Sequence, residues 1–143
     1  IISEILSLET DNKQLDEIGP GGLIGVGTTI DPYYCKDDQL SGNIIGLIGK
    51  LPSVYDEIKL KYSIIDDFGG SWKPKVNDNI FLQIGTLSIN SIITEFSKKN
   101  FSVKLSRPAC IDSDSMIMIS RKEEGIMKIV AMGSLISGNK LVN

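Results

Sequence analysis

The stretch that decides the fold class is Ile58-Lys59-Leu60-Lys61-Tyr62-Ser63-Ile64, in which apolar and polar side chains alternate. Successive side chains of a β-strand point to opposite faces, so a period of two predicts a strand with one apolar and one wet face. A second stretch, Phe101-Ser102-Val103-Lys104-Leu105, repeats this pattern. Together they predict a sheet that packs one face on a core.

The period of two continues along most of the 143 residues, and no long stretch keeps helical spacing without a Gly, a Pro or a β-branched interruption. An all-β fold of the barrel or sandwich type follows. Nine short strands are predicted, at residues 2–8, 23–30, 43–48, 58–64, 80–85, 88–96, 101–105, 116–120 and 126–132.

Charge divides the chain near its first third. Residues 1–50 hold 3 basic and 8 acidic side chains, whereas residues 51–143 hold 12 and 10. The acidic, glycine-rich part ends at Lys50-Leu51-Pro52-Ser53, which predicts a domain junction at about residue 50. The first part has too few strands to close a barrel, so we expect it to keep an unpaired edge. The start at Ile1, without Met, favours a fragment of a longer protein.

Composition argues against several kinds of site. The chain has no histidine, which removes the commonest metal ligand and general base. Its two cysteines, Cys35 and Cys110, are far apart and predict neither a disulfide framework nor a zinc site. No window is long and apolar enough to span a membrane, so we expect no membrane partner. Cysteines without a disulfide framework favour a cytoplasmic protein. We expect neither a resident metal nor catalytic residues, because histidine is absent.

Acidic pairs and one tryptophan have ordinary interpretations. Asp37-Asp38, Asp66-Asp67 and Asp112 with Asp114 lack the spacing of a metal site, so we expect solvated loops. Trp72 follows a loop rich in turn residues and is either a lid on the barrel or an exposed contact.

The most distinctive run is Pro20-Gly21-Gly22-Leu23-Ile24-Gly25-Val26-Gly27-Thr28-Thr29-Ile30-Asp31-Pro32. A phosphate-binding loop is not supported, because no Gly-Lys-Ser/Thr follows the glycines and the next residues disfavour a helix start. Spacing alone favours a strand whose glycines permit a bulge or the close approach of another backbone or a ligand.

This run, with Cys35 and the Gly-rich stretch that ends at Leu51-Pro52, resembles the gamma-subunit family of eukaryotic and archaeal translation initiation factor two. Three later motifs are similar to that family but weaker: Asn79-Ile80-Phe81-Leu82-Gln83-Ile84-Gly85-Thr86-Leu87-Ser88, Arg107-Pro108-Ala109-Cys110 and Ile119-Ser120-Arg121-Lys122. The resemblance covers nearly the whole chain. It departs in a shorter loop at 66–77, and in 123–128 and 131–133, where the family's tryptophan is absent.

The resemblance implies β-barrel domains of the elongation factor Tu type. Residues 1–50 would be the last strands of the second domain, and residues 51–143 the complete third domain. GTP and magnesium would bind a domain absent from this chain, which by itself would be a scaffold and not an enzyme. Implied partners are initiator methionyl-tRNA, the alpha and beta subunits of the factor, and the small ribosomal subunit.

Two sets of candidate site residues follow. The glycine-rich strand is expected to line the aminoacyl-tRNA pocket, since glycines let a backbone approach the tRNA end and apolar neighbours form a wall; these residues are Gly21, Gly22, Leu23, Ile24, Gly25 and Val26. A run of basic residues without an intervening acid is the second set. It is expected to contact RNA phosphates, unless it is an ordinary solvated strand face or protects a strand edge from aggregation; it comprises Lys98, Lys99, Lys104 and Arg107.

Two rival functions stay open at the level of sequence. One is the β-barrel tail of another translational GTPase, such as a selenocysteine-specific elongation factor. The other is a β-barrel that binds only protein, which would be favoured if the face around Lys98 and Arg107 were buried against a partner.

Overall fold

The computed structural model describes residues 1–11, 13–65 and 72–141. These residues form two compact units, 1–40 and 41 onward. Within the described residues, no helix is long and apolar enough to cross a membrane, and no group of acidic or cysteine side chains is arranged to hold a metal ion.

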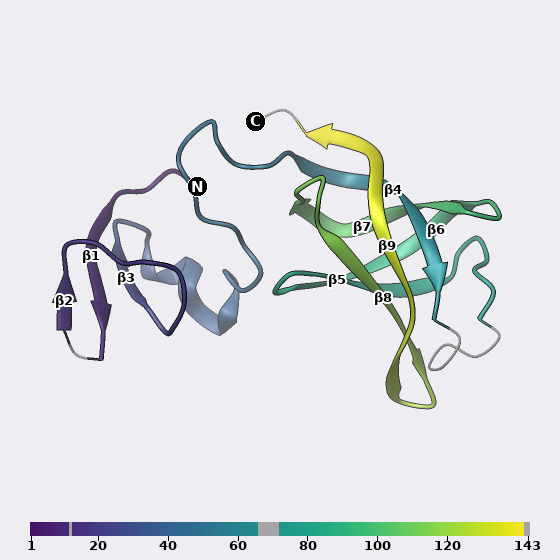
Figure 1. Cartoon of the computed structure of the whole chain (residues 1–143), viewed down its shortest axis with the longest axis horizontal. Coiled ribbons are helices and arrows are strands. Elements are labelled where there is room, and N and C mark those ends of the chain that lie inside the picture. Colours follow the sequence, from purple (N-terminus) through teal and green to yellow (C-terminus); the bar gives the residue numbers. More distant parts are fainter. Residues whose placement is uncertain (12, 66–71, 142–143) are drawn as a thin grey trace. The chain divides into compact units, whose positions relative to one another are not determined.

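The first unit is a small antiparallel sheet followed by a short helix (Figure 1). Strand β1 (Ile5–Thr10) lies between β2 (Lys13–Leu15) and β3 (Gly25–Thr28), so the sheet is open, as its low strand number predicts. The 3-10 helix η1 (Pro32–Asp38) begins where the Asp31 carboxylate accepts a hydrogen bond from the Tyr33 amide at 2.9 Å. An Asp cap before a first-position proline is a favourable helix start.

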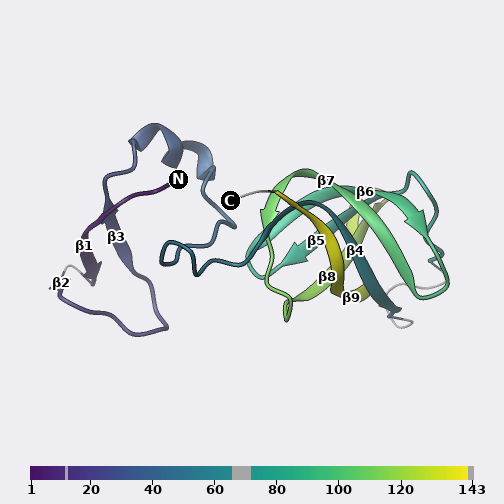
Figure 2. The ribbon, with the colours of Figure 1, turned by 90° about the horizontal axis from the view of Figure 1, so that it is seen from above.

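The second unit contains a closed six-stranded barrel with the order β4-β7-β6-β5-β8-β9. Figure 2 looks at it from above. All neighbouring strands are antiparallel. The strands are β4 (Val54–Ile64), β5 (Asn79–Ile84), β6 (Leu87–Phe96), β7 (Asn100–Cys110), β8 (Met116–Glu123) and β9 (Ile126–Leu141).

The barrel interior is filled by the apolar half of each alternating strand. In β4, Ile58 and Leu60 are buried, while Lys59 and Lys61, which alternate with them, are exposed. This confirms the fold class expected from the sequence. The residues buried almost completely are Ile58, Leu60, Ile80, Leu82, Ile89, Ile93, Phe101, Val103, Ile111, Ile117, Ile119 and Val130.

Trp72 belongs to this core. Only 4% of its surface is exposed, and its ring meets Tyr62 edge-on with centroids 6.4 Å apart. Tyr62 in turn packs on Phe101 at 4.9 Å. Of the two interpretations left open for Trp72, the lid on the barrel is therefore the correct one. The predicted acidic loop at Asp66-Asp67 lies outside the described residues.

Residues 43–48 do not form the strand that the sequence predicts. They have no strand partner, and Ile45, Leu47 and Ile48 are each more than three-quarters exposed. Apolar β-branched residues favour a strand, but a strand also needs a neighbour to accept its backbone hydrogen bonds. The sequence pattern does not reveal whether that neighbour is present.

Strand β2 was not predicted, and several strand ends differ from the prediction. The strand predicted at 23–30 covers only Gly25–Thr28, and the turn before it contains Gly21 and Gly22, which adopt positive φ angles of 107° and 77°. Strand β9 continues to Leu141, beyond the predicted end at residue 132. Asp112 and Asp114 lie in an exposed loop, as expected, whereas Asp37 and Asp38 are exposed at the end of helix η1 and not in a loop.

Candidate functional site

The predicted pocket residues fall into a turn and a strand. Gly25 and Val26 lie in β3 opposite Glu9 and Leu8 of β1. Leu23 and Ile24 precede the strand, and the Leu23 carbonyl accepts a hydrogen bond from the Thr10 hydroxyl at 3.0 Å. The strand and the turn before it are therefore anchored on β1.

Different structural constraints explain the glycines of this run. The positive φ angles of Gly21 and Gly22 explain both without a ligand. At Gly27, a Cβ atom would fall on the Ser7 hydroxyl. At Gly25, a Cβ atom would meet only Glu9, at an ordinary contact distance of 3.6 Å. The described contacts of the first unit therefore do not require glycine at position 25.

Two apolar side chains of the run are turned to solvent. Leu23 is 90% exposed and Val26 is 39% exposed, whereas Ile24 is half-buried. Single exposed apolar residues are common on proteins. Beside an exposed Gly25 backbone, however, they have the composition expected for the wall of an apolar ligand site.

Lys98 and Lys99 lie in the turn between β6 and β7. The Ser97 amide donates to the Asn100 carbonyl at 2.7 Å and closes this turn. The Lys99 carbonyl accepts from the Tyr62 amide at 3.1 Å, which fixes the turn against β4. Both lysines are exposed, and neither forms a salt bridge within the described residues.

Lys104 differs from these two lysines because an acid already pairs with it. Its Nζ donates to Asp56 Oδ2 at 2.6 Å, and Asn139 donates to the other carboxylate oxygen at 2.8 Å. These hydrogen bonds, the one from Lys104 first, hold the pKa of Asp56 below its ordinary value, and the carboxylate raises the pKa of Lys104. A phosphate would have to compete with Asp56 for this ammonium group.

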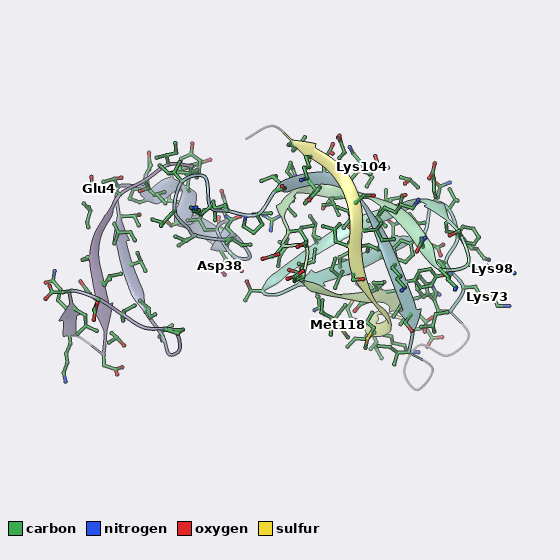
Figure 3. The ribbon with its side chains drawn as sticks, turned by 45° about the horizontal axis from the view of Figure 1, so that its top comes forward. Glu4, Asp38, Lys73, Lys98, Lys104 and Met118 are labelled. Atoms are coloured by element: carbon green, nitrogen blue, oxygen red, sulfur yellow. The ribbon has the colours of Figure 1, made fainter. Side chains whose placement is uncertain are left out.

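Of the four predicted basic residues, Lys98 and Lys99 lie in the turn before β7, and Lys104 and Arg107 lie in β7. Figure 3 shows Lys98 at one end of the barrel and Lys104 away from that end. Arg107 is exposed and lies where the register between β4 and β7 shifts. At about 3.3 Å per residue, Arg107 is at most roughly 23 Å along β7 from Asn100, the residue after Lys99.

Lys73 is a further basic residue at the same end of the barrel as Lys98, and the sequence pattern did not indicate it as a candidate. It follows the buried Trp72, whose ring contacts Tyr62, and Tyr62 is hydrogen-bonded to the Lys99 carbonyl. Figure 3 places Lys73 and Lys98 at the same end of the barrel. The pattern could not reveal this proximity, because the fold brings together residues 25 positions apart.

Comparison with known families decides the assignment. The family model described as "Initiation factor eIF2 gamma, C terminal" matches residues 56–135, from within β4 to within β9. The chain belongs to the eIF2 gamma family. Its barrel is the C-terminal β-barrel domain of that family, as the resemblance implied.

Curated eIF2 gamma proteins align with nearly the whole chain. The Encephalitozoon cuniculi protein is 37% identical over 139 residues, which cover 96% of this chain and 32% of the relative. The Pyrococcus horikoshii protein is 32% identical, covering 93% and 34%. The Drosophila melanogaster protein, eIF2 subunit 3, is 31% identical over 152 residues, covering 99% and 32%.

The chain thus spans about a third of the length of the curated relatives it matches. These relatives are named as translation initiation factors, so the alternative of another translational GTPase is not favoured.

Proposed function

We propose that the complete protein delivers initiator methionyl-tRNA to the small ribosomal subunit in the cytoplasm, in a GTP-dependent complex with its alpha and beta subunits. The observation that supports this proposal most strongly is the alignment of this chain with initiation factor 2 gamma proteins along nearly its whole length. GTP and magnesium would be bound by the part of the protein outside this chain. The chain itself would act as a scaffold that faces RNA.

Two features of the chain support the RNA-facing role. The Lys98-Lys99 turn carries two exposed cations without an acidic partner among the described residues. Exposed cations are the minimal requirement for contact with RNA phosphates. The Gly25 strand presents an open backbone beside Leu23 and Val26, which suits the approach of an aminoacylated tRNA end.

Replacing Lys98 and Lys99 by Ser in the complete protein should make binding to the small ribosomal subunit less dependent on salt. Each phosphate contact contributes roughly 0.7 to 0.9 to the slope of log K against log salt concentration, so the slope should fall by roughly 1.4 to 1.8. Binding measured between low and physiological salt gives this slope. Exposed charges contribute little to folding, so the melting temperature should stay nearly constant.

Lys104→Ser is the matched control. Its ammonium group is already paired with the Asp56 carboxylate at 2.6 Å, and a phosphate would have to displace that partner, so the slope should change little. An unaltered slope in the Lys98/Lys99 double variant would contradict the RNA-facing role and leave the two lysines as ordinary solvated residues of the turn.

The isolated chain should not bind guanine nucleotide. The glycines of this run lie in or just before strand β3, and the next helix, η1, begins at a proline without a preceding Gly-Lys-Ser/Thr motif. Calorimetric titration of the 143-residue chain with GTP and magnesium should give no saturable heat. Saturable binding at micromolar concentration would overturn the placement of the nucleotide site in another part of the protein.

A further inference from the structure

All four methionines of the chain lie on two neighbouring strands. Met116 and Met118 belong to β8, and Met127 and Met132 to β9. Met118 pairs directly with Met132 across the two strands. Together with Ile129 of β9, these side chains define what we call the methionine face: Met116, Met118, Met127, Ile129 and Met132.

The methionine face is on the outside of the barrel. Ile117, Ile119 and Ala131 alternate with it along the two strands and are completely buried in the core. Met116 is 65% exposed, Met127 46% and Met132 38%. Outward positions of an antiparallel barrel strand are usually polar, because they face water. The core therefore gives no reason for apolar side chains here, and exposed apolar side chains gathered on two neighbouring strands are typical of an interaction site.

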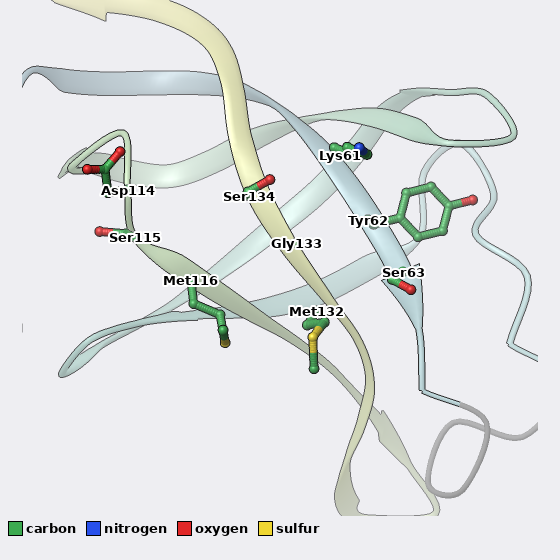
Figure 4. A pocket seen from close by; sticks show the side chains of 9 residues that line it. All are labelled: Lys61, Tyr62, Ser63, Asp114, Ser115, Met116, Met132, Gly133 and Ser134. Carbon is green, nitrogen blue, oxygen red and sulfur yellow. The ribbon is translucent and has the colours of Figure 1, made fainter.

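Part of the methionine face forms an open groove across β4, β8 and β9, with a volume of about 370 Å³ (Figure 4). Met116 and Met132 line it, and Figure 4 shows Asp114 to the left and Lys61 to the right, both above the two methionines. Within the described residues, neither Lys61 nor Asp114 takes part in a salt bridge. The groove thus offers an apolar floor with one free charge of each sign beside it.

These properties favour a protein partner over RNA or a small molecule. The groove residues include one cation, Lys61, and Asp114 opposes it, so the charges do not attract a phosphate backbone. Because the groove opens on the outside of three adjacent strands, it cannot enclose most of a small ligand's surface. Methionine side chains are flexible and polarisable, and they suit surfaces that accept apolar side chains of another protein.

The closed barrel also restricts the kind of segment that can bind. A partner strand can extend a sheet only at a free edge, and within the described barrel every strand from β4 to β9 has a neighbour on both sides. An amphipathic helix needs no free edge, because it binds through its side chains.

We propose that the methionine face docks an amphipathic helix of a protein partner. Apolar side chains of the helix pack on Met116 and Met132. An acidic side chain at one end meets Lys61, and a basic side chain at the other meets Asp114. This surface borders the Lys98-Lys99 turn, because the Tyr62 amide beside the groove donates to the Lys99 carbonyl, but the proposal does not depend on the RNA-facing role.

The probe is a synthetic amphipathic helix of about 15 residues, with Leu on one face, Glu near one end and Lys near the other. It is titrated into the chain carrying carbon-13 in its methionine methyl groups. Since all four methionines lie on the face, every labelled methyl reports on it. The Met116 and Met132 signals should shift saturably at micromolar peptide, and changing both residues to Ser should weaken binding at least about tenfold.

Charge exchange tests the orientation. Lys61→Glu should weaken binding by about threefold, the effect of an exposed ion pair, and a peptide with Glu replaced by Lys should restore it. Lys59→Glu is the matched control, because Lys59 is also exposed on β4 but does not line the groove, and binding should be unchanged. Circular dichroism should give the same melting temperature for every variant.

Three results would overturn the proposal. The first is the absence of methyl shifts at about millimolar peptide, far above the expected micromolar affinity. The second is a shift with protein concentration alone, which would assign the face to a second copy of the chain. The third is a methionine face that does not respond to peptide in the complete protein, which would show that the rest of the polypeptide covers it.

Discussion

Replacing Gly138 by Ala is expected to destabilise the chain by about 1–3 kcal/mol, the usual cost of forcing extra atoms into a packed region. Gly138 lies in β9 opposite Ile58 of β4. A Cβ atom there would approach the Glu57 carbonyl oxygen to 2.7 Å and the Tyr55 ring to 2.6 Å. A backbone oxygen in a barrel strand cannot move aside cheaply, so β9 would have to separate from β4.

Urea unfolding of the 143-residue chain measures this effect. Ser137→Ala is the matched control, since Ser137 is the exposed neighbour of Gly138 in the same strand and its change should stay within about 0.5 kcal/mol. An equal stability of the Gly138→Ala variant and the parent would show that the two strands are not held as closely as the structure places them.

The pairing of β4 with β9 also marks the limit of what the sequence could predict. Alternation in β4 and β7 predicts a sheet with one buried face, and the barrel confirms it. The end of β9 was missed because Gly133, Ser134, Ser137 and Gly138 have low strand propensity and resemble a loop. Only the structure shows that the β4 backbone lies so close to Gly133 and Gly138 that it leaves no room for a side chain at either position.

Local signals were informative where partners are close in sequence. The Asp31-Pro32 start of η1 could have been recognised from its cap and its first-position proline, although the sequence prediction did not include it. The false strand at 43–48 shows the opposite case, because its side chains favour a strand but no described strand lies beside it.

The candidate sites also divide into features that local sequence predicts and features that depend on distant strand partners. The exposure of Lys98 and Lys99 follows from a turn signal that is local in sequence. The pairing of Lys104 with Asp56, 48 residues earlier, depends on the register between β4 and β7 and could not be predicted. The methionine face was missed for a related reason, since Met116 and Met118 predict a strand but do not indicate which side faces water.

Replacing Gly25 by Val in the complete, GTP-bound protein is expected to weaken methionyl-tRNA binding at least tenfold, about 1.4 kcal/mol. Gly25 is exposed in β3 next to Val26, and the proposed function brings the aminoacylated end of the tRNA to this strand. A branched side chain there would keep the tRNA end from the backbone. GTP affinity should not change, because the nucleotide is proposed to bind outside this chain.

Two properties of the site keep this result interpretable. A Cβ atom at Gly25 meets only Glu9, at 3.6 Å, and valine is favourable in strands, so the variant should fold with an unaltered melting temperature. Gly19→Ala is the matched control, since nothing lies within 4 Å of a Cβ atom there and Gly19 is not among the proposed pocket residues. Filter binding with labelled methionyl-tRNA compares the three proteins. If the folded Gly25→Val variant binds tRNA as tightly as the parent, glycine at this position serves neither the described fold nor the tRNA, and the pocket must be sought elsewhere.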